Sequence, residues 1–184
     1  MDNKQKKQLL SYARESIRTA FLGEEYKPKK IPKILLKKLG AFVTLHVRHN
    51  NALRGCIGIT APIMPLYECV VKCARSSAFE DTRFMPLSMK EFEDIRIEIS
   101  VLSKPTLIKE KGNKILEKIN IGKDGLIIEY LGNSGLLLPQ VAVEENYTAK
   151  TFVEMSCWKA GVPKNSYLRA ECKIYKFQAD VFSE

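Results

Sequence analysis

The strongest chemical signal in this sequence is the string Leu-Arg-Gly-Cys-Ile-Gly at positions 53–58. Cys56 contributes a thiol, whose deprotonated form is a nucleophile, and the guanidinium of Arg54 would favour that form. Gly55 and Gly58 stand on either side of the cysteine, and glycine inside a strand marks a bulge or the close approach of a backbone or a ligand. The string therefore predicts a ligand contact or a nucleophile at Cys56, with packing as a small apolar side chain as the alternative.

A nucleophilic cysteine needs a base, and the base needs a group that orients it. His46 is the candidate base, and Asp81 or Glu98 is the candidate orienting carboxylate. Arg83 follows closely after Asp81, so that two arginines and two carboxylates accompany the cysteine. Such groups either clamp an anionic substrate or pair with one another. The candidate catalytic residue is thus Cys56, with His46 as its base, and the candidate ligand-binding residues are Arg54, Gly55, Gly58, Asp81, Arg83 and Glu98.

A β-hairpin must position these side chains. Residues 41–59 have the pattern of two alternating strands joined by a His-Asn-Asn turn. With these three residues as the loop, Thr44 faces Cys56 and His46 faces Arg54. His46 and Cys56 then become diagonal neighbours, about 7 to 8 Å apart at the backbone, on the face opposite the apolar side chains.

The rest of the chain mixes helices and strands without regular alternation. Apolar spacing of three and four residues predicts helices, and strict alternation predicts strands. Helices are expected at 4–22, at 65–77, just after Ser88, near 108–118 and at 149–160, and further strands at 95–101, 126–130, 136–138 and 172–182. Ser88 and Glu91 have the spacing of a capping box at the start of the third of these helices. This order predicts the α+β class, with a mixed, largely antiparallel sheet and flanking helices.

Length and composition set outer bounds. The chain has 184 residues, which suits one domain or two small ones packed together, and 45% of them are apolar, which excludes general disorder. There is no apolar run of about 18 to 20 residues that would cross a bilayer, and the first residues lack the apolar stretch of a signal peptide, so we expect a cytoplasmic protein without a membrane partner. Five cysteines are an odd number, which favours reduced thiols.

The positive charge is concentrated near the N-terminus. The formal net charge is +9, and the first 50 residues hold 12 Lys and Arg against 4 Asp and Glu, whereas the remaining 134 hold 18 against 17. The densest part consists of lysines at 27, 29, 30, 33, 37 and 38. Such a patch attracts the phosphates of nucleic acid or a small anion. The alternative is an ordinary solvated lysine-rich face.

Metal and cofactor sites are not expected. Cys69 and Cys73 stand one helical turn apart, but no second pair completes the four ligands of a zinc site, and the helical stripe explains both as core residues. The sequence contains no GxxxxGK[ST], no GxGxxG after a strand, no HExxH and no GxSxG. The absence of these motifs argues against common nucleotide-binding and hydrolase machinery.

Several blocks of the sequence resemble the AMMECR domain family, named after the Alport syndrome, midface hypoplasia and elliptocytosis chromosomal region. They are the string at 53–58, Gly-Ala-Phe-Val-Thr-Leu at 40–45, Pro-Leu at 65–66, Asp-Thr-Arg-Phe at 81–84, Glu-Ile-Ser-Val-Leu at 98–102, Gly-Lys-Asp-Gly-Leu at 122–126, Leu-Leu-Leu-Pro-Gln-Val at 136–141 and Lys-Ala-Gly at 159–161. The resemblance implies a single domain over 1–184, with a larger and a smaller subdomain and a cleft between them near the string. It also implies that such domains occur alone or fused to Memo-like and radical-SAM enzymes.

Two functional hypotheses follow. The first is an enzyme or enzyme-accessory domain that binds a small anionic or modified metabolite in a cleft at 53–58. The second is a noncatalytic module that recognises a protein or RNA through the basic N-terminal region. Neither hypothesis specifies a reaction, and the resemblance implies none.

Overall fold

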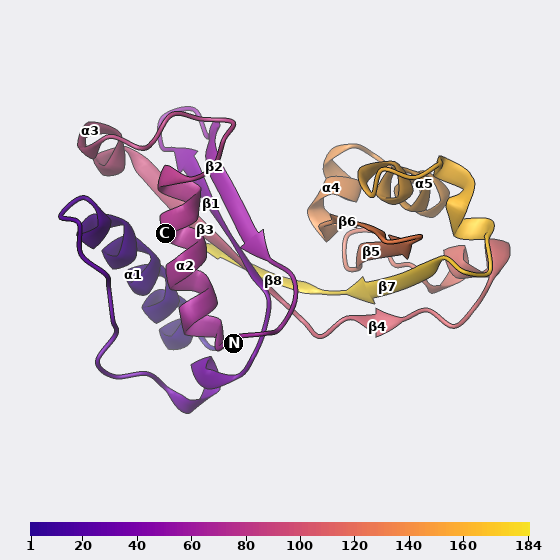
Figure 1. Cartoon of the computed structure of the whole chain (residues 1–184), viewed down its shortest axis with the longest axis horizontal. Coiled ribbons are helices and arrows are strands. Elements are labelled where there is room, and N and C mark those ends of the chain that lie inside the picture. The colour runs from indigo at the N-terminus through magenta and orange to yellow at the C-terminus, as the bar shows by residue number, and fades with distance from the viewer. The chain divides into compact units, whose positions relative to one another are not determined.

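The computed structural model describes all 184 residues, and the chain divides into two compact units. Unit 1 comprises residues 1–102 and 180–184, and unit 2 comprises residues 103–179. Each unit has its own sheet (Figure 1). Both sheets have four strands, and each unit has its own hydrophobic core. The expected α+β class and the largely antiparallel pairing are confirmed. No helix combines the length and the apolar character that crossing a membrane requires.

Unit 1 is a sheet with two long helices packed together on one face. Its strands lie in the order β2-β1-β3-β8, so that β2 is an edge strand. Its elements are α1 (Asn3–Ala20), η1 (Lys33–Leu36), β1 (Ala41–Val47), β2 (Leu53–Ile59), α2 (Leu66–Phe79), α3 (Met89–Glu93), β3 (Ile95–Leu102) and β8 (Ala179–Ser183). The helices expected at 4–22 and 65–77 therefore form within a few residues of the predicted bounds.

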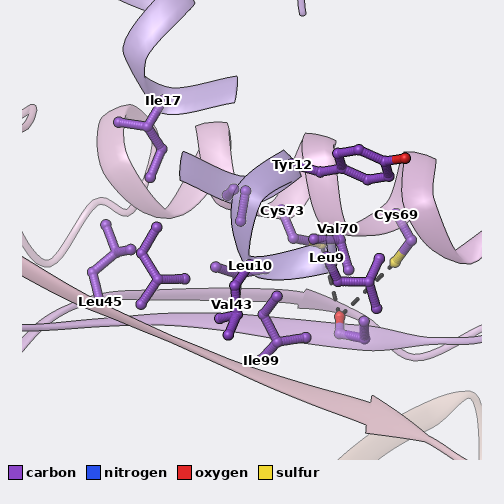
Figure 2. Close-up of a cluster of buried hydrophobic side chains, with 14 of the residues drawn as sticks. Leu9, Leu10, Tyr12, Ile17, Val43, Leu45, Cys69, Val70, Cys73 and Ile99 are labelled. Atoms are coloured by element: carbon purple, nitrogen blue, oxygen red, sulfur yellow. Dashed lines mark hydrogen bonds between the residues drawn. The ribbon is translucent and has the colours of Figure 1, made fainter. Parts of the chain in front are cut away.

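The core of unit 1 explains which sheet face remains polar. Figure 2 shows Leu9 of α1 and Val70 of α2 against Val43 and Ile99 of the sheet, and all four side chains are buried. Burying each such side chain stabilises the fold by roughly 1.5 to 3 kcal/mol. Because alternate residues of a strand point to opposite faces, the neighbours of the apolar residues point away from the helices. The half-buried polar residues Thr44, His46, Cys56 and Glu98 therefore share the other face.

The hairpin register agrees with the prediction up to Leu45 and then departs from it. Thr44 pairs with Cys56 as expected, but a β-bulge after Leu45 pairs His46 with Leu53 instead of Arg54. The reason is the turn, in which the N–H of Val47 donates to the carbonyl of Ala52 at 2.9 Å. This pairing leaves one extra residue on β2, and Arg54 is that residue.

Unit 2 is a smaller sheet of strand order β4-β7-β5-β6 with its own helices. Its core includes the fully buried Phe152 and Cys157 of α5 with Leu126 and Ile128 of β5. Its elements are β4 (Thr106–Leu107), η2 (Gly112–Lys118), β5 (Gly125–Tyr130), β6 (Asn133–Leu137), α4 (Pro139–Glu144), α5 (Ala149–Lys159), η3 (Lys164–Leu168) and β7 (Lys173–Phe177). The short helix expected near 108–118 is a 3-10 helix.

The prediction of one last strand at 172–182 was wrong, because two strands occupy this segment. β7 belongs to the sheet of unit 2 and β8 to the sheet of unit 1. Gln178 lies between them and exchanges two hydrogen bonds with Ser103, at 2.8 and 2.9 Å. Around the change of sheet the alternation continues, with Phe177, Ala179 and Val181 apolar and Gln178 and Asp180 polar, so that the sequence carries no sign of the change at Gln178.

Substitution of Gly55 tests the packing of α2 on β2. A Cβ atom at Gly55 would lie 2.1 Å from the carbonyl oxygen of Ser77, whereas one at Gly23 would meet nothing within 4 Å. We expect Gly55→Ala to lower the free energy of unfolding by about 3 kcal/mol, because two backbones must separate. Gly23→Ala is the control and should cost only about 1 kcal/mol, from its positive φ. Urea unfolding measures both, and equal losses would contradict this packing.

Candidate functional site

The backbone of Cys56 is held by an ion pair at the free edge of β2. Its N–H donates to Oδ2 of Asp81 at 2.8 Å, and its carbonyl accepts a hydrogen bond from Nη2 of Arg83 at 3.1 Å. The two side chains also bind each other, with Nε to Oδ1 at 2.9 Å and Nη2 to Oδ2 at 2.7 Å. The pair therefore occupies hydrogen-bonding positions that a further strand would use.

The end of α2 brings Asp81 to this edge. The hydroxyl of Ser77, in the last turn of α2, accepts a hydrogen bond from the N–H of Ile57 at 2.9 Å and donates one to the carbonyl of Val43 at 2.7 Å. The helix end is thus joined to both strands of the hairpin. Asp81 follows four residues later and is directed onto Cys56.

Asp81 is suited to accept hydrogen bonds and not to remove a proton. The side chain of Arg83 holds the pKa of Asp81 well below its usual range, and the N–H groups of Cys56 and Arg83 lower it further, against the opposing effect of burial. Both carboxylate oxygens are engaged by these groups. The carboxylate therefore stays ionised and positions Arg83 and the Cys56 backbone.

Arg54 binds a carboxylate that the sequence did not mark as part of the site. Its Nε donates to Oε1 of Glu91 at 2.8 Å, and its Nη2 donates to Oε2 of Glu91 at 3.2 Å and to the carbonyl of Met85 at 2.9 Å. Arg54, followed by the hydrogen bonds from Ser88, lowers the pKa of Glu91 to about 2. Nη1 of Arg54 is buried and has no hydrogen-bond partner.

The guanidinium beside Cys56 belongs to Arg83, whereas the sequence suggested Arg54. Asp81 is the main cause of the raised pKa of Arg83, and Cys56 adds a smaller increase. The Cys56 thiol is half-buried and accepts a hydrogen bond from the hydroxyl of Thr44 at 3.3 Å. The other four cysteines are free and buried.

Phe84 brings the two arginines together. The guanidinium carbon of Arg54 lies 5.8 Å from the centre of the Phe84 ring, and that of Arg83 lies 5.5 Å from it. Both distances are in the range of cation–π contact. We call Arg54, Arg83 and Phe84 the arginine pair and its ring. The sequence placed Arg83 and Phe84 in one block but gave no sign that Arg54 would join them.

His46 contacts the hairpin turn and β3. Its Nδ1 lies 3.3 Å from the carbonyl oxygen of Asn51, and its Nε2 lies 3.9 Å from Oε1 of Glu98. Nε2 is buried and has no hydrogen-bond partner. No hydrogen bond joins His46 to Cys56, since the two ring nitrogens lie near Asn51 and Glu98 instead. A role for His46 as base, with Glu98 as its carboxylate, stays a prediction.

The two glycines of the string admit close contacts within the chain itself. Gly55 faces the carbonyl of Ser77, and a Cβ atom at Gly58 would lie 2.2 Å from the ring of Phe42. Internal packing therefore accounts for both residues, and their contact with a ligand stays a prediction.

Three residues that contribute to the site were not predicted from the sequence. Glu91 was expected only to cap a helix, Phe84 only belonged to a block of the resemblance, and Ser77 was only the end of a predicted helix. No group of three or more His, Cys, Asp or Glu side chains is placed to hold a metal ion.

The Arg54–Glu91 ion pair makes stability depend on pH. Because the pKa of Glu91 is lower in the folded chain than its value of about 4.3 in an unfolded one, the pair stabilises the fold above that pH, and the contribution is lost as the pH falls towards 2. We expect Glu91→Gln to cost about 1 kcal/mol at pH 7, since partly exposed pairs contribute modestly, and less as the pH falls. Urea unfolding between pH 7 and pH 3 measures the difference.

The control for this prediction is Glu93→Gln, because Glu93 lies on the same helix, is exposed and has no ion pair. This variant should match the unchanged chain at every pH. A cost of Glu91→Gln that stays constant from pH 7 to pH 3 would contradict the assignment of the low pKa.

Comparison with known proteins supplies the family. The model of the AMMECR1 family matches residues 10–182. Protein MJ0810 of Methanocaldococcus jannaschii is 44% identical over 174 residues, covering 94% of this chain and 87% of that protein, and Protein PF1979 of Pyrococcus furiosus is 46% identical over 161 residues, covering 85% and 76%. The crystal structure of uncharacterized protein PH0010 from Pyrococcus horikoshii matches with a TM-score of 0.94 at 42% identity, covering all of this chain and 93% of that one. This chain therefore belongs to the AMMECR1 family.

Proposed function

We propose that unit 1 binds a small anionic or modified metabolite at residues 53–58, and that the chain acts in the cytoplasm as an enzyme or enzyme-accessory domain. The observation that carries this proposal is the arginine pair and its ring. Two guanidinium groups beside one aromatic ring, next to a half-buried thiol, favour a ligand that carries negative charge.

The unused hydrogen-bond donors define what the ligand must offer. Within each guanidinium, protein oxygens occupy Nε and Nη2, whereas Nη1, which carries two N–H groups, has no partner. A carboxylate or phosphate group accepts such donors. The Arg83 side chain is 54% exposed, so that an incoming anion meets Arg83 first. Contact with the buried Nη1 of Arg54 requires neighbouring side chains to move.

The acidic residues at the site support binding more than acid–base chemistry. Asp81 and Glu91 have lowered pKa values and are engaged with arginines, so neither is poised to take up a proton at neutral pH. Their role in this proposal is to orient the arginines. Cys56 as nucleophile and His46 as base belong to the same proposal, in which ligand binding would have to bring the two side chains together.

The test of this proposal is ligand retention by the full chain. Native mass spectrometry of the purified protein should reveal a bound anionic compound, and Arg83→Ala should weaken its binding at least tenfold. Arg83→Lys should restore it only in part, since lysine keeps the charge but not the planar pair of donors. The control is Arg169→Ala, because Arg169 is an exposed arginine without an ion pair. Undiminished binding to Arg83→Ala would contradict the site.

Cys56 supplies an independent readout. A thiol reagent should modify one cysteine per folded chain, because the other four are buried, and Cys56→Ser should abolish the reaction. The retained compound should slow the modification in proportion to its occupancy. Modification at an unchanged rate when the compound is bound would place the ligand elsewhere.

A second candidate function is recognition of RNA or an acidic protein through the basic N-terminal segment. The six lysines that form its densest part are all exposed, and only Lys27 is paired, with Glu25 at 3.0 Å. The segment runs from the loop after α1 through η1 to Lys38. Its charge is therefore available to phosphate or carboxylate groups of a partner.

Salt dependence tests this second candidate. We expect a single-stranded RNA to bind with an affinity that falls steeply with salt, and Lys29→Glu with Lys33→Glu to weaken binding at least tenfold and to flatten the salt slope. The matched control is Lys104→Glu with Lys109→Glu, which makes the same change of charge at two exposed residues outside this segment. An equal loss of affinity in the control would show that the loss reflects net charge and not this segment. The absence of RNA binding by the unchanged chain would exclude RNA as the partner.

A further inference from the structure

Unit 1 has a pocket of about 360 Å³ that lies apart from Cys56 and the arginine pair. One wall is α2, which contributes Glu68, Lys72 and Arg75. These residues are spaced by four and three positions, so they lie on one face of the helix. The opposite wall is the segment after α1, which contributes Glu25 and Tyr26.

Hydrogen bonds within the chain hold this pocket in shape. At its floor, the hydroxyl of Ser16 in α1 donates to the carbonyl of Val71 in α2 at 2.7 Å, which joins the two helices. On the other wall, Tyr26 packs beside Tyr12 with ring centres 6.1 Å apart, and the Tyr12 hydroxyl donates to the carbonyl of Lys30 at 2.7 Å. The pocket is therefore formed before any ligand arrives, as small-molecule sites usually are.

The pocket contains charges of both signs that do not neutralise one another. Lys72 and Arg75 supply two cations, and neither has a carboxylate within 4.0 Å. Of the three carboxylates, Glu68, one turn before Lys72, has no ion pair, Glu80 binds only the hydroxyl of Ser76, at 2.6 Å, and Glu25 is paired with Lys27. A ligand with a single charge would be attracted by the pocket residues of opposite sign and repelled by those of the same sign. A ligand with both charges satisfies both.

We propose that this pocket binds a small zwitterion, an amino acid with an apolar side chain. Its carboxylate contacts Lys72 and Arg75, and its ammonium group contacts Glu68 from the same helix. The apolar side chain lies against Val71 and the ring of Tyr26. A volume of about 360 Å³ is within the range of about 300 to 1,000 Å³ for small-molecule pockets. This site adds to the function proposed at residues 53–58 and does not depend on it.

Three compounds that share the same branched apolar chain test the requirement for both charges. Leucine carries both groups, 4-methylpentanoate only the carboxylate and 3-methylbutylamine only the ammonium group. In amide chemical-shift titrations of the full chain, we expect leucine to shift residues 68–76 and the other two compounds to bind at least tenfold more weakly. Equal binding by either single-charge compound, shifts confined to other residues or no shifts with leucine at millimolar concentration would each overturn the proposal.

Single substitutions assign the two charged groups. Arg75→Gln and Glu68→Gln should each weaken leucine binding about three- to tenfold, because each removes a charge-assisted contact made by an exposed side chain. Lys7→Gln is the control, since Lys7 is exposed on α1 and does not line the pocket. Arg83→Ala should also leave leucine binding unchanged, which separates this site from the one at residues 53–58. Unchanged binding to both Arg75→Gln and Glu68→Gln would overturn the proposal.

Discussion

The candidate site depends on the close packing of the end of α2 against the β1–β2 hairpin. The hydroxyl of Ser77 bridges the two strands at Val43 and Ile57, and its carbonyl approaches Gly55 where no side chain intervenes. A larger residue at position 55 would separate helix and strand. The chain that leaves α2 would then no longer bring Asp81 to the backbone of Cys56.

Ion pairs at this site serve mainly to orient side chains. Asp81 and Glu91 each occupy one edge of a guanidinium, which directs the remaining N–H groups of Arg83 and Arg54 elsewhere. A half-buried guanidinium that lacked such a partner would be costly to desolvate. The carboxylates therefore lower the cost of gathering two cations around Phe84, and this is the arrangement that supports an anionic ligand.

The two proposed sites in unit 1 use the two sides of α2 in different ways. The side that faces the sheet carries buried apolar residues and Ser77, which position the hairpin. The side that faces the segment after α1 carries Glu68, Lys72 and Arg75, whose charges remain unpaired. The same helix thus fixes the geometry of one site through packing and supplies the charges of the other.

The sequence alone determined the features that depend on local pattern. The hairpin strands, the pairing of Thr44 with Cys56 and the capping box of Ser88 and Glu91 follow from alternation and from fixed spacing along the chain, and the structure contains all of them. Only the tertiary structure decided the bulge at Arg54. In the predicted register Arg54 lies opposite His46, whereas in the structure it binds Glu91. The tertiary structure also decided that residues 172–182 serve two sheets. The bulge depends on the hydrogen bond that Val47 donates to Ala52 across the turn, and the change of sheet depends on strand pairing between residues distant in sequence. The periodicity of a single segment encodes neither of these contacts.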